Sequence, residues 1–163
     1  MCDYCGCRRR AAIDELSEEH ERLLDLTYGL RRAARREDHV AVMATLADEI
    51  VPLLQHHTDK EERGLFTQLR QAWGCDTRLD TLIDEHRDIE DRIERIRAAA
   101  PAWPAEVRRL ADTLSAHIMD EETDLFPYAV YELDDAHWSA IDAVHASPDL
   151  LAATSHLEVA PVR

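Results

Sequence analysis

Residues 117–128 read HIMDEETDLFPY, and residues 57–66 read HTDKEERGLF, with the histidine, the paired glutamates and the Leu-Phe at identical spacing. Two further stretches, LSEEH at 16–20 and LIDEH at 82–86, also match each other and end in a histidine. Each LxxEH stretch precedes one HxxxE stretch, so the chain reads as two copies of a helical hairpin. Two such hairpins packed together predict a four-helix bundle.

Apolar residues recur every three to four positions over most of the chain, which predicts helices at about 11–35, 38–73, 77–99, 105–126 and 134–146. Gly74 is the expected end of the second helix, and Pro127 that of the fourth. The predicted fold class is all-α, an antiparallel up-down four-helix bundle with a short additional C-terminal helix. The predicted organisation is a cysteine-rich tail at 1–10, one helical domain at 11–146 and a flexible tail at 147–163.

The composition agrees with one helical domain. The chain has 163 residues, of which 45% are hydrophobic and 33% charged, with only four glycines and six prolines. Its formal net charge of −15 disfavours nucleic acid and anionic membrane surfaces as partners. No apolar run approaches the ~20 residues that span a bilayer. A soluble, cytoplasmic protein is therefore expected.

Four histidines and two glutamates fall on the apolar stripes of the predicted helices. In each HxxxE pair the two residues differ by only about 40° in direction, so both point inward. A lone histidine on such a stripe is normally a satisfied core residue, but two unpaired buried glutamates would each cost several kcal/mol. A bound cation removes that cost. The candidate metal ligands are His20, His57, Glu61, His86, His117 and Glu121.

Imidazole and carboxylate donors without a thiolate suit iron, manganese or zinc. Four nitrogens and two carboxylates are too many for one tetrahedral zinc, and suit two ions with bridging carboxylates. None of the nine histidines follows a glutamate by three residues, which disfavours the Glu-x-x-His site of ferritin-like proteins. Glu122, beside Glu121, is expected on a different and solvated face.

The pattern H…HxxxE…H…HxxxE, with EExxLF beginning at each motif glutamate, resembles the hemerythrin-like, or HHE cation-binding, domains of bacteria over about residues 13–130. The resemblance implies that residues 11–146 hold two non-heme iron ions joined by an oxo or hydroxo bridge. It places one iron on His20 and His57 and the other on His86 and His117. Glu61 and Glu121 would bridge the two.

The resemblance also draws attention to positions where this chain departs from the O2 carriers. Those carriers have a further histidine one turn after the third-helix ligand, where this chain has Glu90, a candidate additional ligand. The position one turn after His20 is Leu24, which cannot ligate, so that iron should have the more open coordination. The candidate walls of a small-ligand pocket, otherwise plain core, are Leu24, Leu53, Leu54 and Leu114.

The implied function is that of a protein that binds or senses O2, NO or peroxide in an oxidative or nitrosative stress response. A binding protein is favoured over an enzyme. The alternatives are catalase-like removal of peroxide, iron delivery or iron–sulfur cluster repair, and a structural or iron-sensing module. The same open position suits all three small ligands, and the sequence indicates neither the redox partner nor the oligomeric state.

Three of the four cysteines, Cys2, Cys5 and Cys7, form a CxxCxC motif beside three arginines. Neighbouring positive charge lowers the pKa of a thiol and makes it more reactive. These cysteines are a candidate redox or second metal site, and the alternative is a flexible tail with incidental thiols. In a reducing cytoplasm a permanent disulfide is not expected.

Overall fold

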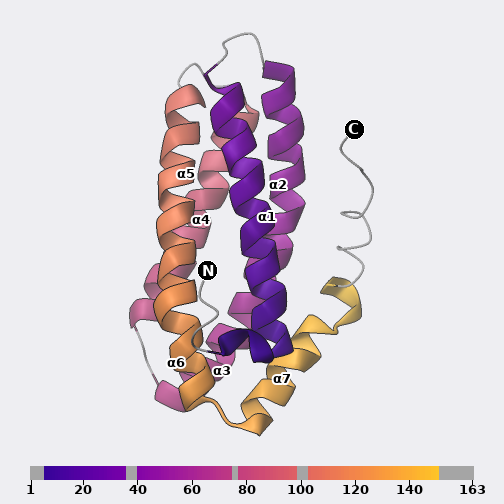
Figure 1. The fold of residues 1–163 in the computed structure, drawn as a ribbon, viewed down its shortest axis with the longest axis vertical. Coiled ribbons are helices and arrows are strands. Elements are labelled where there is room, and N and C mark those ends of the chain that lie inside the picture. The colour runs from indigo at the N-terminus through magenta and orange to yellow at the C-terminus, as the bar shows by residue number, and fades with distance from the viewer. Residues whose placement is uncertain (1–5, 36–39, 75–76, 99–102, 151–163) are drawn as a thin grey trace.

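The computed structural model describes residues 6–35, 40–74, 77–98 and 103–150, and within them it is helical almost throughout, with no strand. Four long helices form the body: α1 (Ala11–Ala33), α2 (Val40–Lys60), α4 (Thr77–Arg97) and α5 (Trp103–Asp120). Each packs against its neighbour in sequence, and α1 also packs against α5, which closes the ring. Neighbouring helices run in opposite directions (Figure 1). The predicted all-α bundle is therefore confirmed.

Both helices that carry an HxxxE motif are interrupted by a single π-helical turn. The first, η2 (Glu61–Leu65), joins α2 to α3 (Phe66–Trp73), and the second, η3 (Glu121–Leu125), joins α5 to α6 (Phe126–Glu132). Each π turn begins at the glutamate of its motif. A π turn has hydrogen bonds from residue i to i+5, and such turns occur frequently at functional sites.

The predicted helix ends are partly right. Gly74 ends α3 with a φ of 82°, a conformation that suits glycine, and its N–H bonds to the carbonyl of Arg70 at 2.9 Å. Pro127 was expected to end a helix, and this was wrong, because it lies in the first turn of α6. The helix therefore continues from the π turn η3 through Pro127 and ends only at Glu132.

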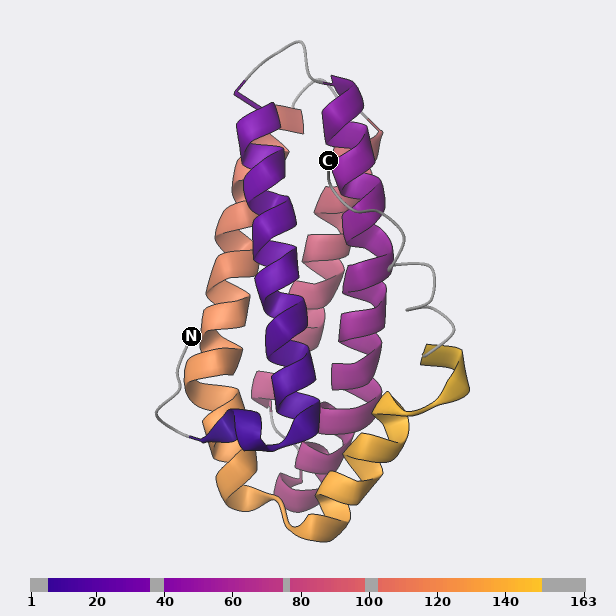
Figure 2. The ribbon, with the colours of Figure 1, turned by 45° about the vertical axis from the view of Figure 1, so that its right-hand side comes forward.

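The predicted short C-terminal helix is present as α7 (Asp135–His145). The Asp134 side chain caps it by accepting hydrogen bonds from the backbone N–H groups of Ala136 and His137, both at 3.0 Å. The helix lies across the end of the bundle where the π turns are, and contacts η2, α1, α2 and α3 (Figure 2).

The buried apolar side chains form two separate clusters. One cluster, at the α7 end, includes Leu16, Leu65, Leu82 and Leu125. The other cluster, toward the far end, includes Leu23, Leu54, Ile89 and Leu114. Along the chain, each of the four predicted histidine ligands falls between a residue of one cluster and a residue of the other. The two clusters therefore lie on either side of a layer of polar side chains.

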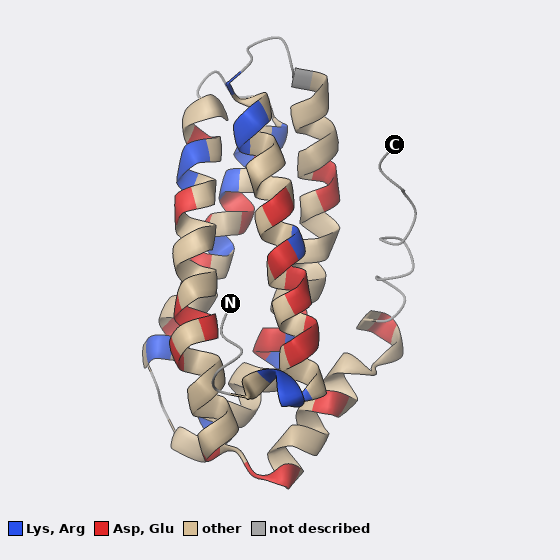
Figure 3. Ribbon diagram, viewed as in Figure 1, with Lys and Arg blue, Asp and Glu red and all other residues tan. Residues whose placement is uncertain are grey.

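The whole chain has 34 acidic residues against 19 lysines and arginines. Figure 3 shows acidic segments on α1, α2 and α5. Among the described residues, no helix is both long and apolar enough to cross a membrane.

Candidate metal centre

One histidine from each long helix points into the polar layer. These are His20 on α1, His57 on α2, His86 on α4 and His117 on α5, with exposures of 0%, 2%, 2% and 3%. Each sits on the apolar stripe of its helix, so packing of that stripe also buries the imidazole. The predicted convergence of these four side chains on the bundle axis is present in the structure.

Glu61 and Glu121 lie among the histidines and are completely buried. One oxygen of Glu61 is 3.4 Å from the Nε2 of His57 and 3.2 Å from the Nε2 of His86. The two oxygens of Glu121 lie 3.2 Å from the Nε2 of His20 and 3.3 Å from the Nε2 of His117. Each glutamate thus reaches one histidine of either hairpin.

The six side chains form two overlapping groups, in each of which the potential ligand atoms lie within 4.8 Å of one another. The first group contains His20 and His57, and the second contains His86 and His117. Glu61 and Glu121 belong to both groups. This arrangement offers two neighbouring positions for a metal ion, with two carboxylates shared between them.

The outward-facing Nδ1 atom of each histidine meets a second carboxylate, which was not predicted from the sequence. Glu19 bonds to His57 at 3.0 Å and Glu85 to His117 at 2.8 Å. Glu62 bonds to His86 at 2.8 Å and Glu122 to His20 at 3.0 Å. A carboxylate here holds Nδ1–H as the donor, fixes the ring and leaves the lone pair on Nε2 for a metal ion.

The expectation that Glu122 is solvated was wrong, because it is only 8% exposed and bonds to His20. A residue next to an inward-facing one is turned by about 100° around the helix. In a bundle that direction faces the neighbouring helix, here α1, and not water. The sequence does contain a pattern that marks these outer carboxylates: a second glutamate follows both HxxxE motifs, and a glutamate precedes the histidine in both LxxEH stretches.

The Leu-Phe pair that ends each motif has a role in the same layer. Phe126 stacks on the ring of His20 with centroids 5.7 Å apart, and Phe66 stacks on His86 at 5.8 Å. Both phenylalanines are 1% exposed. Each hairpin therefore supplies an aromatic ring that packs against a histidine of the other hairpin.

Burial and neighbouring charges set the pKa values in this layer. Burial alone would lower the pKa of His20, but its contacts with Glu121 and Glu122 outweigh burial and raise the pKa to about 10. Glu61 and Glu62 likewise overcome burial and raise the pKa of His86 to about 10. Burial, followed by repulsion from the other histidines, holds the pKa of His57 well below its usual range. Without a metal ion, protons therefore balance the charge of the glutamates.

The buried polar atoms left without a hydrogen bond fit a pair of cations. They include Nε2 of His20 and of His57 and both carboxylate oxygens of Glu61 and Glu121, which approach one another as ion pairs but without hydrogen-bond geometry. The Nε2 atoms of His86 and His117 face each other at 3.0 Å, so their lone pairs meet unless a proton or cation lies between them. Buried polar groups without partners cost free energy, and metal ions bound by these atoms would remove that cost.

We expect metal affinity to rise with pH. The protons held on His20 and His86, whose pKa values are raised to about 10, must leave Nε2 before a metal ion binds there. Below that pH, each displaced proton changes the affinity by up to about tenfold per pH unit. Isothermal titration of the metal-free protein with Co2+ at pH 6.5, 7.5 and 8.5 measures this slope. An affinity that does not change with pH would contradict protonation of these two histidines.

Glu90 does not join either group of ligands. It lies one turn after His86 on α4, is partly buried, and lines a surface pocket of about 170 Å³ with Leu54 and Gln55. Burial raises the pKa of its carboxyl group above the ordinary value. Of the four leucines predicted to wall a ligand pocket, Leu53, Leu54 and Leu114 are buried in the far cluster, and Leu24 is partly buried against it.

The cysteine motif is only partly within the described residues, because Cys2 and Cys5 lie outside them. Cys7 is 4% exposed in the cluster at the α7 end and is disulfide-bonded, unlike the free thiol that was expected. Of the histidines outside the candidate ligand set, His56 is buried, His137 bonds to Asp134 and His145 bonds to Glu15. His39 and His156 lie outside the described residues.

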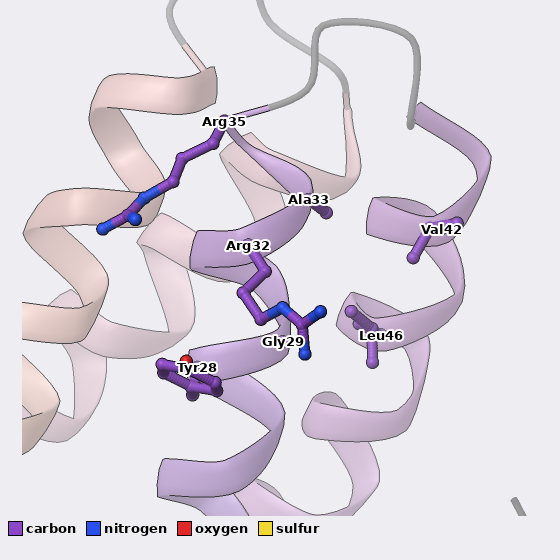
Figure 4. Close-up of a pocket in the computed structure, with 7 residues that line it drawn as sticks. All are labelled: Tyr28, Gly29, Arg32, Ala33, Arg35, Val42 and Leu46. Atoms are coloured by element: carbon purple, nitrogen blue, oxygen red, sulfur yellow. The ribbon is translucent and has the colours of Figure 1, made fainter.

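A larger hollow lies between α1 and α2, away from the polar layer. It has a volume of about 600 Å³, and its lining includes Tyr28, Arg32 and Leu46 (Figure 4). Tyr28 is eight residues beyond His20, which is roughly 12 Å along α1. The hollow contains none of the candidate ligands.

Comparison with known proteins agrees with the geometry. Residues 11–129 match the hemerythrin HHE cation binding domain family, and α7 lies beyond the matched region. A protein from Nostoc sp. described as a DNA nickase is 33% identical over 76 residues, which are 45% of this chain and 21% of that protein. This chain therefore spans only about a fifth of that relative. No solved structure matches.

The match to the family covers most of the chain, and the buried His/Glu groups lie within the matched residues. The protein is therefore a helical metal-binding protein that belongs to the hemerythrin HHE cation-binding domain family.

Proposed function

We propose that the protein holds two non-heme iron ions and uses them to bind or sense a small ligand of the O2, NO or peroxide class. The observation that carries this proposal is the sharing of Glu61 and Glu121 between two groups of ligands. A pair of ions needs carboxylates that reach both positions, whereas one ion would leave part of this donor set unused. When bound, such a pair supplies redox-active sites for small diatomic or peroxide ligands.

The surrounding side chains suit this function. Glu19, Glu62, Glu85 and Glu122 hold the outer nitrogens of the histidines, which keeps the rings oriented with Nε2 toward the metal positions. Apolar clusters cover the polar layer on both sides and restrict the access of water. Leu24 stands one turn after His20, and Glu90, one turn after His86, lies outside both groups of ligands, so each position has room for a small ligand.

Metal analysis tests the proposal most directly. Protein purified from iron-supplied cells is expected to contain about two iron ions per chain and to absorb in the near ultraviolet and visible range in its oxidised state. Reduction should bleach this absorption, and exposure to O2 or NO should change it. A single zinc ion per chain would reject the di-iron proposal. Evolution of O2 from added peroxide would favour the catalase-like alternative.

A further inference from the structure

Lys60 is a completely buried lysine next to the candidate centre. It lies between His57 and Glu61 in sequence and has 0% exposure. Its ammonium group donates to Glu15 at 2.6 Å and to Glu19 at 2.5 Å. Lysine is almost never fully buried unless it is paired, so these two carboxylates are what keeps it in the interior.

Glu19 connects Lys60 to the metal layer. One of its oxygens accepts from Lys60, and the other bonds to Nδ1 of His57 at 3.0 Å. Glu15 extends the connection outward, because its second oxygen bonds to Nδ1 of His145 at 2.6 Å. His145 is the last residue of α7, which lies outside the part of the chain that matches the family.

The other half of the bundle lacks this arrangement. By the internal repeat, Glu85 corresponds to Glu19, Thr81 to Glu15 and Asp120 to Lys60. Thr81 and Asp120 are exposed, and the side chain of Glu85 is 34% exposed. The carboxylate on His117 is therefore open to water and has an acidic residue at the position of the lysine, whereas the carboxylate on His57 is buried against a cation.

This difference acts on the ligand strength of the two histidines. A carboxylate on Nδ1 increases the basicity of the imidazole and its affinity for a metal ion. An ammonium group on the same carboxylate draws its charge away, and also repels a cation bound nearby, with little screening in a buried site. Both effects weaken the position on His20 and His57 relative to the position on His86 and His117.

We propose that Lys60 is a positioning residue that makes the two metal positions unequal, so that the one on His20 and His57 binds its ion more weakly. This inference rests on the proposed pair of metal ions. Because Glu15 holds Lys60 and is itself bonded to His145, the inequality depends partly on α7, which lies beyond the matched residues. A weakly held ion beside a tightly held one gives a centre that loads in sequence.

The test is a calorimetric titration of the metal-free protein with Co2+, with the absorption of bound Co2+ recorded in parallel. The wild type is expected to bind two ions in separate steps. His57→Gln should remove the weaker step and His117→Gln the tighter one. Removal of the tighter step by His57→Gln would overturn the assignment, and so would two wild-type steps of equal affinity.

Two variants then change the charges that surround Glu19, without changing Glu19 itself. In Lys60→Met/Glu15→Gln, one cation and one anion are removed together, which avoids leaving an extra buried charge. The weaker step is expected to tighten by about ten- to a hundredfold, the usual range for partners of metal-ligating histidines. Glu15→Gln alone leaves the charge of Lys60 less balanced and should weaken that step further. This single variant serves as the test if the double variant does not fold, as judged by circular dichroism.

Asp120→Asn is the matched control, because it changes the exposed counterpart of Lys60. It should leave both steps unchanged. If both binding steps keep their wild-type affinities in folded Lys60→Met/Glu15→Gln and in Glu15→Gln, Lys60 does not make the two positions unequal. That result would leave the proposed pair of metal ions intact. Fewer than two ions in the wild type would instead reject the pair itself, and the inference with it.

Discussion

Replacing Glu61 with alanine is expected to remove both metal ions and not only one. The carboxylate of Glu61 belongs to both groups of ligands and lies within 3.4 Å of Nε2 of His57 and 3.2 Å of Nε2 of His86. Its loss leaves each position with one carboxylate fewer and opens a void between them. Elemental analysis after reconstitution with iron should give well under one ion per chain.

Two other glutamates serve as controls for this variant. Glu62→Ala removes the outer partner of His86 and should weaken metal binding by about ten- to a hundredfold, with both ions still bound at saturation. Glu90→Ala should leave the metal content unchanged, because Glu90 is outside both groups. Two ions retained in Glu61→Ala would contradict the sharing of this carboxylate, and loss of metal in Glu90→Ala would identify Glu90 as a ligand.

Among these substitutions, Phe126→Ala should lower the free energy of unfolding the most. Phe126 is 1% exposed, belongs to the cluster at the α7 end and stacks on His20. Truncation of a buried phenylalanine removes its apolar contacts and leaves a cavity, which typically costs about 3–5 kcal/mol. Urea unfolding of the metal-free variant and of the wild type measures the difference in the free energy of unfolding.

Tyr131→Ala is a suitable comparison, since this tyrosine is on the same helix and 84% exposed. Its free energy of unfolding should differ from that of the wild type by less than about 0.5 kcal/mol. A similarly small change in Phe126→Ala would mean that the ring does not fill the space between the cluster and His20.

The bundle and the six inner side chains could be predicted because the chain contains its pattern twice. His57 and Glu61 alone look like ordinary boundary residues, but His117 and Glu121 repeat them at the same spacing. Their spacing of four residues on apolar stripes then fixes both their direction and their burial. The same pattern is the basis of the family resemblance, which the match over residues 11–129 confirms.

The carboxylates that bond to Nδ1 of the histidines were harder to predict, because apolar periodicity divides helix positions only into buried and exposed ones. Glu122 and Glu19 lie at the boundary, where a side chain turns toward a neighbouring helix and is buried by it. Lys60 was missed for the same reason, since its burial depends on carboxylates of α1. The π turns leave little trace in the apolar pattern, because Leu65 and Leu125 follow their glutamates at ordinary helical spacing.

The polar layer between the two apolar clusters has a consequence for folding cooperativity. Packing that continues through a core makes its parts unfold together, whereas regions with few shared apolar contacts can open separately. In the metal-free chain the two clusters meet across a layer with unsatisfied buried oxygens and nitrogens. Bound cations would link the four long helices within this layer, so the two ends of the molecule would unfold as one cooperative unit. Metal binding would then make the whole bundle more rigid, and not only the residues around the site.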